Sequence, residues 1–202
     1  MEFNDIISKL SEEKQYAKEN FVPIIRDESA KFLYNFVKDN GYKNILEIGT
    51  AIGYSGSIIL NAGAEHLTTI DINAEYLKIA KNTFAKLNIL DRVDIYHDDA
   101  WVVINCLKLY GKKFDMIFLD GAKGQYIKYL DVLAELITSN GVIFADNVLL
   151  HGMVESEEKI PHRKRTMVMN LRKYLEKVNE EPYSTELIRM EDGIAITRIK
   201  RR

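Results

Sequence analysis

Two groups of polar residues in this sequence have types and spacings suited to chemistry. The first belongs to the segment Asn44-Ile-Leu-Glu-Ile-Gly-Thr-Ala-Ile-Gly-Tyr-Ser-Gly56, an apolar run that leads into a glycine-rich turn. Gly49 and Gly53 permit a sharp turn and a close approach of a ligand to the backbone, and a helix opening at Tyr54 offers unpaired N–H groups. The order Glu47-x-Gly49-x-x-x-Gly53 differs from the G-x-G-x-x-G of dinucleotide-binding turns. We predict a ligand-binding turn, with an ordinary strand-to-helix turn as the alternative.

The second group consists of Asp120, Lys123, Asp146 and Asn147. Two carboxylates and an amide oxygen are hard ligands, which suit Mg²⁺ or Ca²⁺. A divalent cation lowers the pKa of a bound hydroxyl, and a nearby lysine can take its proton or steady the oxyanion. The group therefore predicts a metal-assisted deprotonation. A surface lysine without a role is the alternative for Lys123.

Short apolar runs alternate with helical segments and position these residues. The expected strands are 45–48, 66–71, 93–97, 114–119 and 141–145, followed by a hairpin of 185–190 and 194–199. The expected helices are 2–20, 27–40, 54–60, 74–87, 99–110, 125–137 and 163–178. Continuous apolar strands are typical of a parallel sheet covered on both faces. We predict an α/β, Rossmann-like fold with a seven-stranded, mostly parallel sheet that ends in an antiparallel hairpin.

Acidic residues end most of the expected parallel strands. They are Glu47, Asp71, Asp98 with Asp99, Asp120, and Asp146 with Asn147. Ligands of open parallel sheets bind outside the carboxyl ends of the strands. Asp71 follows the glycine turn at a distance that suits acceptance of both hydroxyls of a ribose, and Asp99-Ala100 would then lie beside an adenine. Trp101 could stack on that ring, or belong to the core. A helix N-cap is the alternative for Asp71 and for Asp99.

Taken together, these motifs resemble the cation-dependent O-methyltransferases, the family of catechol and caffeoyl-coenzyme A O-methyltransferases. The carriers are Glu47-x-Gly49-x-x-x-Gly53-Tyr54-Ser55, Asp71, Asp120-x-x-Lys123 and Asp146-Asn147. The resemblance implies a class I S-adenosylmethionine methyltransferase fold and Mg²⁺ or another divalent cation. It implies a cofactor site of Ile25, Glu47, Gly49, Thr50, Gly53, Tyr54, Ser55, Asp71, Asp99, Ala100 and Asp120. It also implies that Asp120, Asp146 and Asn147 hold the metal and that Lys123 is the base.

Within that family, the chain looks most similar to the bacterial branch that methylates 5-hydroxyuridine at the wobble position of tRNA. The carriers are 22–25, 120–126, 146–149 and the basic segment 163–166. Neighbouring oxygens on that base can chelate a metal as a catechol does, and an anticodon loop exposes its bases. Arg26, Arg163, Lys164 and Arg165 could hold flanking phosphates, or form a solvated helix face. Methylation of a small catechol-like phenol, and a binding module without catalysis, are the alternatives.

The composition of the chain limits the possible domain organisation, location and partners. The 202 residues are 47% hydrophobic, which predicts one domain of residues 1–202, with N-terminal helices in 1–40 and a catalytic core in 41–202. The sequence lacks an apolar run long enough for a membrane span, so a cytoplasmic protein is expected. Its net charge of −2 is unlike that of a polycation, although basic residues gather in the last quarter and include Lys200-Arg201-Arg202. The single Cys106 is expected to be buried, and a homodimer is expected from the apolar faces of the first helix and last hairpin.

Overall fold

The computed structural model describes residues 1–200 and divides into two compact units, Met1–Val103 and Ile104 onward. Arg201 and Arg202 of the C-terminal basic run lie outside the described residues. Each unit is described by itself below. The single domain expected from the sequence stays a prediction.

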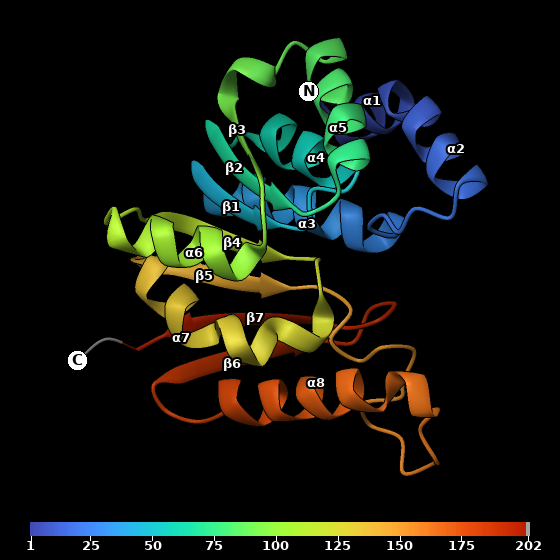
Figure 1. Ribbon diagram of the computed structural model, residues 1–202. Coiled ribbons are helices and arrows are strands. Elements are labelled where there is room, and N and C mark those ends of the chain that lie inside the picture. The colour runs from blue at the N-terminus through green and yellow to red at the C-terminus, as the bar shows by residue number, and fades with distance from the viewer. Residues whose placement is uncertain (201–202) are drawn as a thin grey trace. The chain divides into compact units, whose positions relative to one another are not determined.

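The first unit carries the glycine turn (Figure 1). Its elements are α1 (Phe3–Lys9), α2 (Ser11–Glu19), α3 (Asp27–Asn40), β1 (Asn44–Ile48), α4 (Tyr54–Ala62), β2 (His66–Asp71), α5 (Ala74–Lys86), η1 (Leu90–Arg92), β3 (Val93–His97) and the start of α6 (Ala100–Leu109). The strands are parallel in the order β3-β2-β1, and α4 and α5 both pack on β2. The register pairs Glu47 of β1 with Thr69 of β2, so these side chains are neighbours at the carboxyl ends of their strands.

The second unit carries the predicted metal residues. Its elements after α6 are β4 (Phe114–Leu119), η2 (Lys123–Gln125), α7 (Tyr126–Leu136), β5 (Ile137–Ala145), η3 (His162–Lys164), α8 (Arg165–Val178), β6 (Tyr183–Ile188) and β7 (Ile194–Ile199). The strand order is β4-β5-β7-β6, with β4 and β5 parallel and β7 antiparallel to both of its neighbours. Helix α7 packs on β4 and β5, and α8 packs on α7 and β6. Asp120 and Asp146 therefore follow the carboxyl ends of two adjacent parallel strands.

The predicted α/β class, a seven-stranded mixed sheet with a C-terminal antiparallel pair, is confirmed. The bounds of β2, β3, β4 and β7 match the predicted strands, whereas β5 begins earlier, at Ile137, and β6 lies two residues earlier. The predicted helix 2–20 is two helices that meet at Leu10. Leu10 is fully buried, and the break there lets Ile6 and Ala17 both reach the core. Among the described residues, no helix has the length and apolar character needed to cross a membrane.

One prediction about the side chains is wrong. Cys106 was expected to be a buried thiol, but it is exposed. The buried positions of α6 are Val103, Ile104 and Leu107, which leaves Cys106 on the opposite side of the helix. Because residues 101–109 are mostly apolar, the sequence does not show which face of this helix is exposed.

Candidate active site

The carboxylate of Glu47 is the centre of a hydrogen-bonded network behind the glycine turn. Glu47 is fully buried, and its oxygens accept hydrogen bonds from Ser55 Oγ at 2.5 Å and Thr69 Oγ1 at 2.6 Å. Thr50 Oγ1 lies 2.6 Å from Thr69 Oγ1. Because the hydroxyl hydrogen of Thr69 goes to Glu47, Thr50 is the donor to Thr69. Charge-assisted bonds of this kind compensate the burial of a carboxylate and fix the turn relative to β1, β2 and α4.

Asp71 lies at the edge of the same turn. Its Oδ2 accepts the Ala51 N–H at 2.8 Å and its Oδ1 accepts the Asn73 N–H at 2.9 Å. The backbone there is unusual, with φ of +109° at Gly49 and +43° at Ala51. Asp71 is half-buried, and each of its oxygens keeps a lone pair, so it remains able to accept ribose hydroxyls. Asn73, rather than Asp71, is the N-cap of α5, so the alternative role considered for Asp71 belongs to its neighbour.

Gly53 closes the turn, and its conformation gives a testable prediction. Its φ is +79°, and a Cβ there would lie 3.0 Å from Phe84 Cζ and 3.2 Å from Ala80 Cα. We expect Gly53→Ala to lower the free energy of unfolding by about 2–3 kcal/mol, from backbone strain plus overpacking. Gly41→Ala is the control, because Gly41 has φ +66° and nothing within 4 Å of a Cβ, so only the strain of about 1 kcal/mol applies. Urea unfolding of both variants measures the difference, and equal losses would contradict the packing argument.

Other predicted cofactor residues take differing positions in the first unit. Ile25 and Tyr54 are buried, and burial, with the charges of Asp27 and Glu13 in support, raises the pKa of the Tyr54 hydroxyl to about 12. The Tyr54 side chain therefore packs inside the first unit, and its role in cofactor binding stays a prediction. Asp99 is exposed and its Oδ1 accepts the Trp101 N–H at 2.8 Å, so it caps α6, the role considered as its alternative.

Ala100 and Trp101 follow at the start of α6 and are half-buried. Arg26 is exposed directly before α3. The structure brings Glu47, Thr50, Ser55 and Thr69 together in one hydrogen-bonded network.

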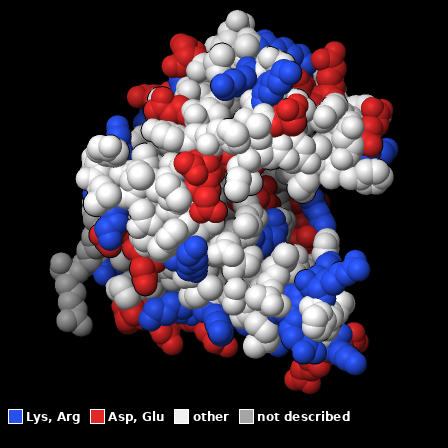
Figure 2. All heavy atoms as spheres, in the orientation of Figure 1, with Lys and Arg blue, Asp and Glu red and all other residues white. Residues whose placement is uncertain are grey.

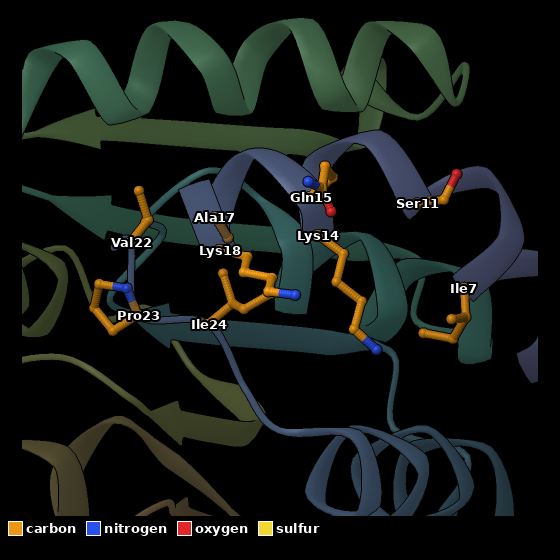
Figure 3. Close-up of a pocket in the computed structure, with 9 residues that line it drawn as sticks. All are labelled: Ile7, Ser11, Lys14, Gln15, Ala17, Lys18, Val22, Pro23 and Ile24. Atoms are coloured by element: carbon orange, nitrogen blue, oxygen red, sulfur yellow. The ribbon is translucent and has the colours of Figure 1, made fainter. Parts of the chain in front are cut away.

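A hollow of about 610 Å³ lies between α2 and residues 22–24, which directly precede Ile25 (Figure 3). Its wall is mainly apolar, and the Lys14 and Lys18 side chains of α2 lie along it. Lys14 Nζ pairs with Asp27 at 2.5 Å. No predicted cofactor or metal residue lines this hollow. No sequence motif predicts this hollow, because it depends on how α2 packs beside residues 22–24.

In the second unit, Asp120 and Asp146 provide the carboxylates. Lys123 Nζ donates to Asp120 Oδ1 at 3.2 Å, and their side chains are 18% and 14% exposed. Asp146 is fully buried, and its Oδ1 accepts the Asn147 N–H at 2.8 Å. Its Oδ2 is also buried and has no hydrogen-bond partner among the described residues. A buried, unpaired carboxylate oxygen is costly, so the site fits a cation that would coordinate it.

Electrostatics support the same conclusion. Burial raises the pKa of Asp146 to about 7, and the charge of Asp120 adds to the rise, against the Asn147 N–H and the Lys123 ammonium. Burial also raises the pKa of Asp120, although Lys123 opposes this. No group of three His, Cys, Asp or Glu side chains surrounds one point in the described part of the chain, and the Asn147 amide stays the predicted third ligand beside the two carboxylates. That composition suits a hard divalent cation that also keeps oxygens from water or substrate.

Tyr126 supports these carboxylates and was missed by sequence reasoning. Its hydroxyl is fully buried, donates to Leu119 O at 2.9 Å and lies 3.3 Å from Asp146 O. It thus joins the ends of β4 and β5 just where the two carboxylates begin. Burial, with the charges of Asp120 and Asp146, raises the pKa of Tyr126, so it stays protonated as a donor. The only sequence signal was its position three residues after Lys123.

Removing this hydroxyl should weaken the unit. We expect Tyr126→Phe to lower the free energy of unfolding by about 1–2 kcal/mol, because Leu119 and Asp146 each lose a buried partner. Tyr183→Phe is the matched control: its hydroxyl is 3.5 Å from Asp131 and only part-buried, so a loss below about 0.5 kcal/mol is expected. Urea denaturation measures both, and a neutral Tyr126→Phe would remove the bridging role.

The turn of residues 120–125, here called the lysine turn, is also in contact with α8. Asn170 Nδ2 donates to Gly124 O at 2.7 Å, which ties η2 to the helix that follows the basic segment. Arg163, Lys164 and Arg165 are exposed and make no ion pair within residues 1–200. Figure 2 shows Lys and Arg side chains gathered at the lower right, where Figure 1 draws the start of α8. Cations at a helix start oppose the helix dipole, so this cluster has an unfavourable electrostatic environment that an anionic ligand would relieve.

Comparison with known proteins gives a consistent result. The model of the O-methyltransferase family matches residues 2–200. The chain is 31% identical to caffeoyl-CoA O-methyltransferase 1 of Eucalyptus globulus over 157 residues, which are 73% of this chain and 64% of that enzyme. A structure from Staphylococcus aureus, provisionally named a caffeoyl-CoA O-methyltransferase, superposes with a TM-score of 0.85 at 31% identity and covers 96% of this chain and 91% of that one.

A second structure adds a bound molecule. The O-methyltransferase from Bacillus cereus, in complex with SAH, has a TM-score of 0.85 at 25% identity, with 96% of this chain and 91% of that chain covered. These matches confirm the predicted class I methyltransferase fold and the predicted enzyme class. The chain belongs to the O-methyltransferase family and is an S-adenosylmethionine-dependent O-methyltransferase of the caffeoyl-CoA O-methyltransferase type.

Proposed function

We propose that this enzyme methylates a hydroxyl that has an oxygen neighbour, with a divalent cation, Mg²⁺ in the first instance, held by Asp120, Asp146 and Asn147. The unpaired, buried Oδ2 of Asp146 carries the proposal, supported by Lys123 on the adjacent Asp120. A divalent cation at these oxygens lowers the pKa of the substrate hydroxyl. We assign the cofactor to the first unit, with Asp71 on the ribose and Glu47 holding the turn.

The chain's own groups then perform two tasks. Lys123 Nζ, in its neutral amine form, would accept the hydroxyl proton, and the resulting oxyanion would attack the methyl carbon of S-adenosylmethionine in line. The O–C bond forms as the S–C bond breaks, and S-adenosylhomocysteine leaves. The rate enhancement comes from placing the two reacting atoms and stabilising the developing charge.

The substrate that we propose is 5-hydroxyuridine at the tRNA wobble position, converted to 5-methoxyuridine. Its 5-hydroxyl and 4-oxo groups are neighbouring oxygens that suit a single cation, and an anticodon loop presents unpaired bases. The exposed, unpaired cations Arg163, Lys164 and Arg165 suit flanking phosphates, and Asn170 links their helix to the lysine turn. Arg26 is a further candidate for a phosphate contact.

Methyl transfer from labelled S-adenosylmethionine tests this proposal. The acceptors are bulk tRNA with and without 5-hydroxyuridine and a simple catechol, each with Mg²⁺ or with a chelator. Label only in the hydroxylated RNA, and only with Mg²⁺, is the expected result. Label in the catechol alone would reject the RNA substrate and reduce Arg163, Lys164 and Arg165 to a solvated helix end.

A small catechol-like phenol is the second candidate. One observation favours it: the plant relatives are named as caffeoyl-CoA O-methyltransferases. This alternative predicts turnover of free catechols at low concentration and none of RNA.

We also propose that the enzyme is a cytoplasmic homodimer. Leu109 and Tyr110 at the end of α6 are 84% and 80% exposed, which supports an apolar contact with a second copy. Sedimentation equilibrium should give twice the mass of 23.3 kDa. A monomer at micromolar concentration would contradict the proposal.

A further inference from the structure

The loop that follows the proposed metal residues is held by the tip of the β6–β7 hairpin, residues 191–193, here called the hairpin tip. Val148 N–H donates to Gly193 O at 3.0 Å, and Leu149 N–H donates to Asp192 O at 2.8 Å. Two consecutive loop amides are therefore bonded to a segment more than forty residues away in the sequence. The sequence predicts only a turn here, between the expected hairpin strands 185–190 and 194–199.

The side chain of Asp192 adds a third connection. Asp192 is only 6% exposed, and its Oδ1 accepts the His151 N–H at 3.2 Å. The same oxygen lies 3.2 Å from His151 Nδ1. A carboxylate is rarely buried unless its charge is used, and here it is directed at the loop. Asp192 thus joins the backbone and the side chain of His151 to the hairpin tip.

The loop backbone needs such support. Asn147, Leu150 and His151 have φ of +56°, +45° and +54°, a conformation that residues with a Cβ seldom adopt. Each costs about 1–3 kcal/mol and persists only where the surroundings impose it. Gly193 has φ +80°, and a Cβ there would overlap the Leu149 side chain. The hairpin tip and the loop are consequently matched in shape as well as in hydrogen bonding.

We propose that Asp192 is a positioning residue for the metal site: it clamps the strained loop so that the Asn147 amide stays beside Asp146. This inference rests on the proposed function, since Asn147 is a metal ligand only there. The hydrogen bonds from Val148, Leu149 and His151 to the hairpin tip hold the loop directly after the proposed metal residues.

Two measurements on the full chain test the clamp. In Asp192→Ala we expect Mn²⁺, followed by its electron paramagnetic resonance signal, to bind about 10- to 100-fold more weakly. Amide hydrogen exchange at His151 should accelerate in the metal-free protein, and kcat should fall while KM for S-adenosylmethionine stays within twofold. Asp192→Asn keeps an acceptor for the His151 N–H and should recover part of the Mn²⁺ affinity.

Thr185→Ala is the matched control in the same hairpin. Its hydroxyl donates to Val178 O at 2.6 Å and lies 2.9 Å from Thr197 Oγ1, away from the loop. Equal Mn²⁺ affinity in Asp192→Ala and Thr185→Ala would overturn the clamp, as would unchanged exchange at His151. If the unaltered protein bound no Mn²⁺, the metal of the proposed function would be rejected, and with it the positioning role.

Discussion

Replacing Lys123 by alanine is expected to lower kcat by about 10³-fold and to leave the dissociation constant of S-adenosylmethionine within twofold. The proposed base Lys123 sits 3.2 Å from Asp120, and only 18% of its side chain is exposed. General-base catalysis typically contributes 10²- to 10⁴-fold. Cofactor binding should persist, because the Glu47 and Asp71 contacts do not involve this side chain. Single-turnover methyl transfer with labelled cofactor measures the loss.

Two further variants separate the roles of the lysine. Lys123→Arg keeps a positive charge beside Asp120 but cannot accept a proton, because the guanidinium stays protonated. If the lysine is the base, the arginine variant should be nearly as slow as the alanine variant. A rate close to that of the unaltered enzyme would show that only the charge matters. Lys128→Ala, an exposed position on α7, is the control for loss of a lysine nearby.

The sequence predicted those parts of the fold that depend on local pattern. The strands 66–71, 93–97 and 114–119 have the predicted bounds, because each is a short apolar run ended by a polar residue. Since parallel strands end at one edge of a sheet, the aspartates that follow β4 and β5 can be grouped from the sequence alone. The spacing indicated only that Lys123 could lie near the carboxylates, and in the structure its Nζ donates to Asp120.

The remaining features depend on contacts between distant parts of the chain. The break at Leu10, the exposure of Cys106 and the hollow beside residues 22–24 are decided by which face of a helix meets its neighbours. Tyr126 and Asp192 act on backbone groups of other elements, so neither leaves a local motif. Local spacing reveals the residues that could react, whereas the residues that hold them emerge from packing.

Replacing Asp146 by asparagine is expected to have the largest effect on activity. The variant removes the charge of the proposed metal ligand whose Oδ2 lacks a partner, while an amide oxygen can still accept the Asn147 N–H. We expect kcat/KM to fall by at least about 10³-fold, equivalent to about 4 kcal/mol of lost transition-state stabilisation. Added Mg²⁺ should not restore it. Activity that survived both this variant and a chelator would reject the metal.

Without metal, Asp146→Asn should make the protein more stable, although the same substitution lowers its activity. The pKa of Asp146 rises from 3.8 to about 7 on folding, so between these pH values the native protein holds a proton that the unfolded chain has released. The metal-free protein therefore loses stability as pH increases through this window, and the loss is complete above pH 7. Asp146→Asn lacks that titration, so at pH 8 with a chelator its free energy of unfolding should be higher by about 1–2 kcal/mol, and it should unfold at a higher temperature than the unaltered protein.

Mg²⁺ should make the unaltered enzyme the more stable of the two, because a cation that binds the native carboxylates stabilises only the unaltered enzyme. Thermal unfolding at pH 5 and pH 8, with and without Mg²⁺, measures both effects, and an aspartate form more stable at pH 8 in chelator would show that the Asp146 carboxylate is satisfied without metal.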